Sequence, residues 1–325
     1  MNTEVTPARR GILVLALIAA VMGYPFVFTS NYAIELGMLV LLGAFLGQAW
    51  NVAGGFAGQF SFGHAAFFGT GAYCSAILVS TYGVNPWLAF ALAAVSGAVV
   101  GGIVGALSFR FGLRGSYFAL ITLAFAEILR VLADSVPITR GGLGILISAD
   151  PGWKNLQFES STGVYYFAAV LCAISLLIAY WLKTSRFGAR LAAIRENEAA
   201  ASALGVNVFW QKVHCLVLSG AMSAVGGAFY VQKYLFIDPY LAYNINRSVE
   251  MLLISMIGGA GTIFGPFVGA LAIGLIGEGT RALSTAPGLS LVVYGLILIL
   301  IIGFLPQGLI GLTSKLRRKG ASNAS

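Results

Sequence analysis

Charged residues are scarce in this sequence. Aspartate, glutamate, lysine and arginine make up 9% of its 325 residues, whereas soluble domains usually contain about 25%. Together with a mean hydropathy of +0.89, this scarcity argues against a soluble fold and predicts an integral membrane protein. The apolar stretches are continuous and do not alternate at every second residue, so they favour spanning helices over a membrane β-barrel.

Residue groupings typical of catalytic and metal sites are also missing. The sequence has no G-x-x-x-x-G-K-S/T phosphate loop, no serine, histidine and acid grouping, and no cluster of metal-ligating side chains. Cys74, Cys172 and Cys215 lie in or beside apolar stretches, where they should pack as small apolar groups. We therefore expect no enzyme, no metal and no cofactor. If ATP drives the protein, its hydrolysis should occur in a separate subunit.

What the sequence does contain is a series of apolar spans, at residues 11–28, 33–50, 86–108, 115–135, 163–182, 213–236 and 289–305. The first follows Arg9 and Arg10 and lacks a convincing cleavage site, so a retained helix is expected instead of a signal peptide. With two glycine-rich stretches, the spans predict an all-α, polytopic membrane protein of about 8–10 transmembrane helices. Residues 1–325 are expected to form a single domain.

Two glycine-rich stretches interrupt these spans. Residues 54–71 and 258–265 each place several glycines within apolar sequence, and irregular backbone at membrane depth survives only where protein or a water-filled cavity surrounds it. We expect broken helices that face the bundle interior and flank a translocation path. A packing role for His64, through hydrogen bonds, is the alternative to substrate contact. The candidate path residues here are Gln59, Ser61, His64, Gly258, Gly259 and Gly261.

Glu127 and Arg130 lie well inside the span 115–135. Each charge, if unpaired, would cost roughly 2.5 to 3.5 kcal/mol at the bilayer centre, so both are expected to face inward. Their i, i+3 spacing predicts an ion pair. The alternative is a polar gate that lines the translocation path.

The longest polar interruption runs from residue 183 to 212. Phe187, Leu191 and Ile194 recur at helical spacing and predict an amphipathic helix with its arginines on other faces. A second, alanine-rich helix should begin after Asn197 as N-cap and stop at Gly205. Such a loop is suited to contact with a cytosolic protein, and its candidate contact residues are Arg186, Arg190, Arg195, Glu196, Glu198, Ala199, Ala200 and Gly205.

Three motifs resemble the LivH/LivM permease family of ATP-binding-cassette importers for branched-chain amino acids. They are GQFSFGHAAFFGTGAY from residue 58, LRGSYFALITLAFAEILR from residue 113 and RENEAAASALGVN from residue 195. The turn TRGGLGI departs from the family pattern because of the inserted Arg140. The resemblance implies transport of leucine, isoleucine or valine, a second homologous permease, two cytosolic ATPase subunits and an extracytoplasmic binding protein. It also implies that residues 183–212 couple the permease to the ATPase.

Basic residues are concentrated at both chain ends and in the loops at 110–114 and 183–212, whereas few lie in the other loops. This asymmetry predicts that both termini and the 183–212 loop lie in the cytoplasm. The resemblance implies a multi-pass protein of the bacterial inner membrane. The asymmetry also explains the net charge of +8 without nucleic acid. The loop at 136–163 becomes a candidate surface for an extracytoplasmic partner.

Two other interpretations remain open on the sequence. Urea, short amides or aromatic acids are possible cargoes of a permease with the same fold. A secondary transporter driven by an ion gradient would need an acidic residue at the middle of the membrane, and Glu127 is the candidate.

Overall fold

The computed structural model describes residues 18–283, 292, 295–296, 299–300, 303 and 308–311. The predicted first span is therefore described from residue 18 onward. Most of the predicted last span lies outside the described residues, as do both basic chain ends.

The described chain is almost entirely helical, as predicted. Five helices are long and apolar enough to cross a membrane: α2 (Asn31–Asn51, continued by a π-helical turn at Val52–Phe56), α4 (Pro86–Arg110), α5 (Gly115–Ser135), α6 (Ser161–Thr184) and α9 (Val208–Tyr234). The shorter helices are Ile18–Val27, α3 (His64–Ser80), α7 (Arg186–Glu196), α8 (Glu198–Ala203), α10 (Pro239–Tyr243), α11 (Ile245–Gly258) and α12 (Gly265–Leu283). The prediction of an all-α, polytopic membrane protein is confirmed.

One small sheet departs from the all-helical pattern. The two-residue strands β1 (Ile145–Leu146) and β2 (Phe236–Ile237) pair antiparallel, with Ile145 opposite Ile237. They join the loop after α5 to the chain that follows α9. Ile145 and Ile237 are both fully buried, so this pair fixes the loop onto the end of the bundle.

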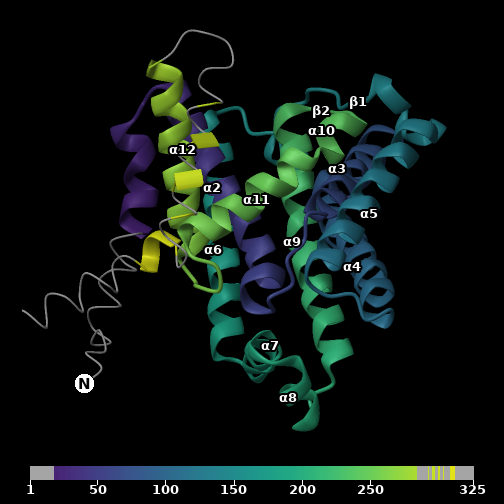
Figure 1. The fold of residues 1–325 in the computed structure, drawn as a ribbon. Helices are drawn as coiled ribbons and strands as arrows, with labels where there is room; N and C mark the ends of the chain where they lie inside the picture. The colour runs from purple at the N-terminus through teal and green to yellow at the C-terminus, as the bar shows by residue number, and fades with distance from the viewer. Residues whose placement is uncertain are drawn as a thin grey trace, which may run out of the picture.

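Helix α9 lies between two groups of helices (Figure 1). Helices α3, α4 and α5 lie on one side, and α2, α6 and α12 lie on the other. Glycines allow α4 and α9 to touch through their backbones: a Cβ added at Gly101 would lie 2.5 Å from the Leu216 carbonyl oxygen, and one at Gly220 would lie 2.5 Å from that of Gly97. Such close contact is typical of helix pairs in lipid, where small residues let backbones approach.

The neighbouring glycines of α4 provide a matched test of this contact. Gly101→Ala should lower the stability of the folded protein in detergent by about 2 kcal/mol, because the added methyl forces α4 away from α9. Gly102→Ala should be neutral or slightly stabilising, since its Cβ would lie 3.4 Å from the Val217 side chain. Thermal unfolding of both variants measures the difference, and equal midpoints would show that the backbone contact is unimportant.

The basic loops gather at one end of the bundle. Helix α4 ends at Arg110, α5 begins at Gly115, α6 ends at Thr184 and α9 begins at Val208, all beside α7 and α8 (Figure 1). The strands β1 and β2 lie at the opposite end. Of the residues whose charge was predicted to set the topology, those of the 110–114 and 183–212 loops are thus brought together on one side.

Candidate functional site

The 183–212 segment forms two helices joined by a one-residue break. Ser185 caps α7, with its hydroxyl oxygen accepting a hydrogen bond from the Gly188 N–H, and Asn197 caps α8 in the same way through the Ala200 N–H. Gly205 adopts a φ of 85°, which favours glycine and ends α8. These capping signals are local, and the two-helix prediction is confirmed.

One face of α7 is anchored to α6. Leu191 and Ile194 are buried, Phe187 stacks on Trp181, and a Cβ at Gly188 would lie 1.6 Å from the Leu182 carbonyl oxygen. This contact leaves α7 little freedom to slide along α6. A force applied to α7 should therefore pass into the membrane helices.

Glu198 ties α8 to two other elements. Its carboxylate contacts the Lys212 ammonium of α9 at 2.8 Å and the Arg114 guanidinium at the start of α5 at 3.3 Å. Lys212 is only 3% exposed and also lies over the Phe109 ring. Glu198 was predicted as a contact residue, but its side chain is engaged within the chain. A cavity of about 370 Å³ lies beside this ion-pair cluster, between α8 and the turn that joins α4 to α5.

The outer face of the segment remains accessible. Arg186 and Arg190 are exposed, and within the described part of the chain neither makes an ion pair. Ala199, Ala200 and Gly205 are exposed as well. Beside them Leu204 is 84% exposed, an apolar side chain at the tip that the sequence analysis did not single out.

At the first glycine-rich stretch, α2 continues into the π-helical turn, and the chain then runs irregularly to α3. His64 is fully buried, with Nε2 2.8 Å from the Ser219 hydroxyl and Nδ1 3.2 Å from the Ser61 hydroxyl. Because Ser219 donates its own proton to the Ala49 carbonyl, it accepts from His64, which is therefore protonated at Nε2. These bonds favour the packing role for His64. Ser61 is equally buried, and the half-buried Gln59 amide donates to the nearby Ala57 carbonyl.

The second glycine-rich stretch is a helical hairpin. Helices α11 and α12 meet so closely that a Cβ at Gly258 would lie 1.7 Å from the Gly265 carbonyl oxygen. The connecting turn contains Gly259 and Gly261, which both have positive φ.

Asn51, which belongs to none of the sequence motifs, joins the two glycine breaks. Its fully buried amide oxygen accepts from the Gly261 N–H at 2.7 Å and from the Ser255 hydroxyl at 3.2 Å. Its amide nitrogen donates to the Thr262 carbonyl at 2.9 Å. The available signal was a polar residue at the end of an apolar span, directly before the glycines.

Arg195 reaches the same place from α7. Its Nη1 donates to the Gly55 carbonyl at 2.8 Å, and its Nη2 lies 3.2 Å from the Glu196 carboxylate. The sequence placed Arg195 away from the apolar face of the helix, among the candidate contact residues, but its guanidinium lies between the two breaks. Of the predicted contact and path residues, Arg195, Gly261 and the first break are thus brought together.

Glu127 and Arg130 form the predicted ion pair, with two nitrogens of the guanidinium bonded to the carboxylate. The expectation that both face inward is wrong for this chain by itself, because the Glu127 side chain is 57% exposed. Arg130 also lies over the ring of Tyr240, which is 61% exposed. Helix α5 is the least buried of the five long helices and lies at the edge of the bundle (Figure 1), so its polar face has no cover from the described residues.

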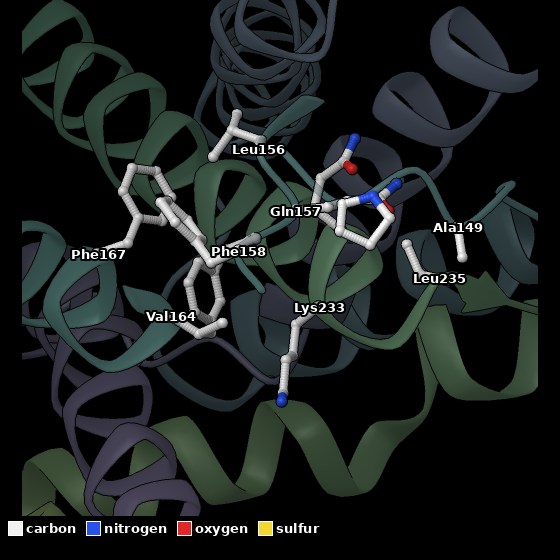
Figure 2. A pocket seen from close by; sticks show the side chains of 11 residues that line it. Ala149, Leu156, Gln157, Phe158, Val164, Phe167, Lys233 and Leu235 are labelled. Carbon is white, nitrogen blue, oxygen red and sulfur yellow. The ribbon is translucent and has the colours of Figure 1, made fainter. Parts of the chain in front are cut away.

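A small cavity of about 170 Å³ lies at the end opposite α7 and α8 (Figure 2). Phe158, Phe167 and Val164 lie together on one side of it, with Gln157 and Leu235 on the other. The Gln157 amide is held by the Asp150 N–H and the Ser148 carbonyl, so it fixes the loop that lines the cavity. Helix α9 spans about 40 Å between this cavity and the α7–α8 segment.

The chain matches the family described as "Branched-chain amino acid transport system / permease component" over residues 32–302. It is 27% identical to the high-affinity branched-chain amino acid transport system permease protein LivM of Escherichia coli, over 94% of this chain and 76% of that protein. It is 24% identical to the LivH permease of the same organism, over 82% and 91%. The ribose import permease protein RbsC of Bacillus subtilis is 28% identical, over 67% and 73%. No solved structure matches the chain.

Proposed function

Because this chain belongs to the family of branched-chain amino acid transport system permease components, we propose that it is the membrane-spanning subunit of an ATP-driven importer that carries leucine, isoleucine or valine into the cytoplasm. The observation that carries this proposal is the family match over most of the chain, together with two capped helices that leave the membrane bundle at its basic end. Residues 18–283 include no group of three or more side chains suited to a metal. Nucleotide chemistry is assigned to a separate subunit, because the sequence has no G-x-x-x-x-G-K-S/T phosphate loop.

The proposed partners are a second homologous permease, two cytosolic ATPase subunits and an extracytoplasmic binding protein. The protein is proposed to lie in a bacterial inner membrane, with the basic α7–α8 end on the cytoplasmic side because of the charge asymmetry. Both termini are proposed to lie on the same side. The opposite end, with its cavity and strand pair, would then face the binding protein.

The α7–α8 segment is proposed as the ATPase contact within a single permease domain. Its exposed face combines the cations Arg186 and Arg190 with small residues and the apolar tip at Leu204. Small residues let another protein approach the backbone, and an exposed leucine gains stability when it is covered. Arg195 and Glu198 act differently, because their side chains are bonded within the chain.

The exposed face of α5 is proposed to line the translocation path together with the second permease. A charged pair facing lipid is costly, whereas the same pair facing water or protein is not. Glu127, Arg130 and Tyr240 therefore need cover, which a second copy of the fold would supply. Glu127 lies about 18 Å along the helix from Gly115, so this face is separate from the ATPase contact.

The proposal is tested by purifying the tagged chain gently from its native cell, identifying its partners by mass spectrometry and reconstituting the complex into liposomes. We expect an ATPase and a second permease, and uptake of labelled leucine that requires ATP and is unaffected by ionophores. Glu127→Ala should reduce uptake with the ATPase still bound, whereas Arg110→Gln, an exposed position at the end of α4, should transport normally.

The rival functions give different outcomes in the same vesicles. Uptake that collapses with an ionophore and proceeds without ATP would indicate a secondary transporter built around Glu127. Labelled ribose is included because a ribose permease is among the similar proteins, and urea, amides and aromatic acids are tested as competitors. ATP-driven uptake of one of these solutes in place of leucine would show that the protein is an importer subunit with a different substrate.

A further inference from the structure

The guanidinium of Arg195 donates a hydrogen bond to a backbone carbonyl that the first glycine break leaves without a helical partner. In a continuous α-helix the Gly55 carbonyl would accept the N–H of residue 59. Here the Gln59 N–H bonds to the Ala53 carbonyl instead, and the Gly55 oxygen accepts from Arg195 at 2.8 Å. Arg195 therefore stabilises the broken form of this backbone, since a regular helix would have no free acceptor at that point.

Glycines on both breaks make room for the same side chain. A Cβ at Gly58 would lie 2.7 Å from the Arg195 Cγ, and a Cβ at Gly261 would lie 2.7 Å from its Nη1. Both glycines have positive φ, of 68° and 76°, so each position disfavours a side chain for two independent reasons. One arginine thus packs against two loops that are more than 200 residues apart in the sequence.

The two loops also touch directly. A Cβ at Gly55 would lie 2.4 Å from the Gly261 nitrogen, and Asn51 bonds that nitrogen from the α2 side. The first break, the hairpin turn and the last turn of α7 consequently form one connected unit, with Arg195 as the link to α7. Its side chain is 40% exposed, so this link lies at the rim of the bundle, where α7 and α8 meet the solvent.

We infer that Arg195 is a positioning residue that transmits movement of the α7–α8 segment to the two glycine breaks. The inference rests on the proposed function, because the movement would come from an ATPase bound to that segment. Since α7 is anchored to α6 and Arg195 lies one residue from its C-terminal end, rotation of α8 displaces the guanidinium first. Withdrawal of Arg195 frees the Gly55 carbonyl and opens space beside Gly261, so the relative position of the breaks follows the state of the ATPase.

The test compares Arg195→Gln with Arg110→Gln in the reconstituted complex. Arg110 is the control because it is an exposed arginine at the end of α4, outside the proposed ATPase contact. We expect Arg195→Gln to keep the ATPase bound and hydrolysing ATP while uptake per ATP falls about tenfold, the effect of losing one charge-assisted hydrogen bond. Arg110→Gln should keep the wild-type ratio of uptake to hydrolysis. Arg195→Lys retains a charged donor and should restore part of that ratio.

A second variant reaches the same contact from the other side. Gly261→Ala keeps the arginine in the sequence, but the added Cβ would displace the Arg195 Nη1 from its position. It should therefore lower uptake per ATP in the same way, even if Arg195→Gln fails to fold. An unchanged ratio in both variants would overturn the inference. So would release of the ATPase by Arg195→Gln with hydrolysis and uptake falling together, since Arg195 would then be a docking contact. If the wild-type complex does not link ATP to uptake, the proposed function itself fails.

Discussion

Replacing Asn51 with alanine should loosen the α11–α12 hairpin from α2 and lower the stability of the protein by about 3 kcal/mol. The substitution leaves the Gly261 N–H, the Thr262 carbonyl and the Ser255 hydroxyl without the partner that each has now. Asn51 is fully buried, so water cannot readily replace the lost bonds. Thermal unfolding in detergent gives the total effect, and hydrogen exchange of residues 258–265 locates it.

Gln59→Ala is the matched control for Asn51→Ala. Gln59 also carries an amide beside the first break, but it is half-buried and donates to the Ala57 carbonyl, only two residues away. Its loss should change stability by less than about 0.5 kcal/mol. If the amide hydrogen exchange rates of residues 258–265 are the same in both variants, Asn51 does not hold the two breaks together.

Glu198→Ala should destabilise the α8 end of the bundle by about 3 kcal/mol, because it leaves the Lys212 ammonium buried without a counter-charge. Lys212 is 3% exposed, so its charge is poorly solvated once the carboxylate is gone. Thermal unfolding measures the loss. Glu196→Ala is the matched control: Glu196 is 76% exposed, and its pair with Arg195 should contribute less than about 1 kcal/mol.

A double variant separates this structural role from a role in docking. Glu198→Gln with Lys212→Met removes both charges, and replacing a buried ion pair by apolar or neutral groups is often close to neutral for stability. We expect the double variant to recover both stability and ATPase binding. Recovery of stability with ATPase binding still lost would show instead that Glu198 itself contacts the ATPase.

The positions of the helices were largely predictable because their signals are local. The apolar spans within residues 31–236, the Asn197 cap and the stop at Gly205 each depend on residues within a few positions of one another, and all three agree with the structure. The Glu127–Arg130 pair belongs to the same class, since i, i+3 spacing on a helix brings the side chains together. The presence of the two breaks followed from their glycine content.

What the sequence did not determine is how these elements meet. Arg195 and Gly55 are 140 residues apart, and Asn51 and Gly261 are 210 apart. No periodicity or capping rule relates them. The exposed position of Glu127 could not be predicted for the same reason. Helical spacing determines which residues share a face of α5, but the packing of the neighbouring helices determines which face of α5 is buried.

The sequence by itself therefore determined the membrane class, the helices, the two breaks and the polar segment between α6 and α9. The tertiary structure alone decided that Arg195 and Asn51 join those breaks, that Glu198 is bonded inward, and that the charged face of α5 is open. The physical reason is that helix formation depends on backbone bonds and side chains a few residues apart. Contacts between helices depend on the relative placement of the whole bundle, which the glycines of α3, α4 and α9 fix through close backbone contact.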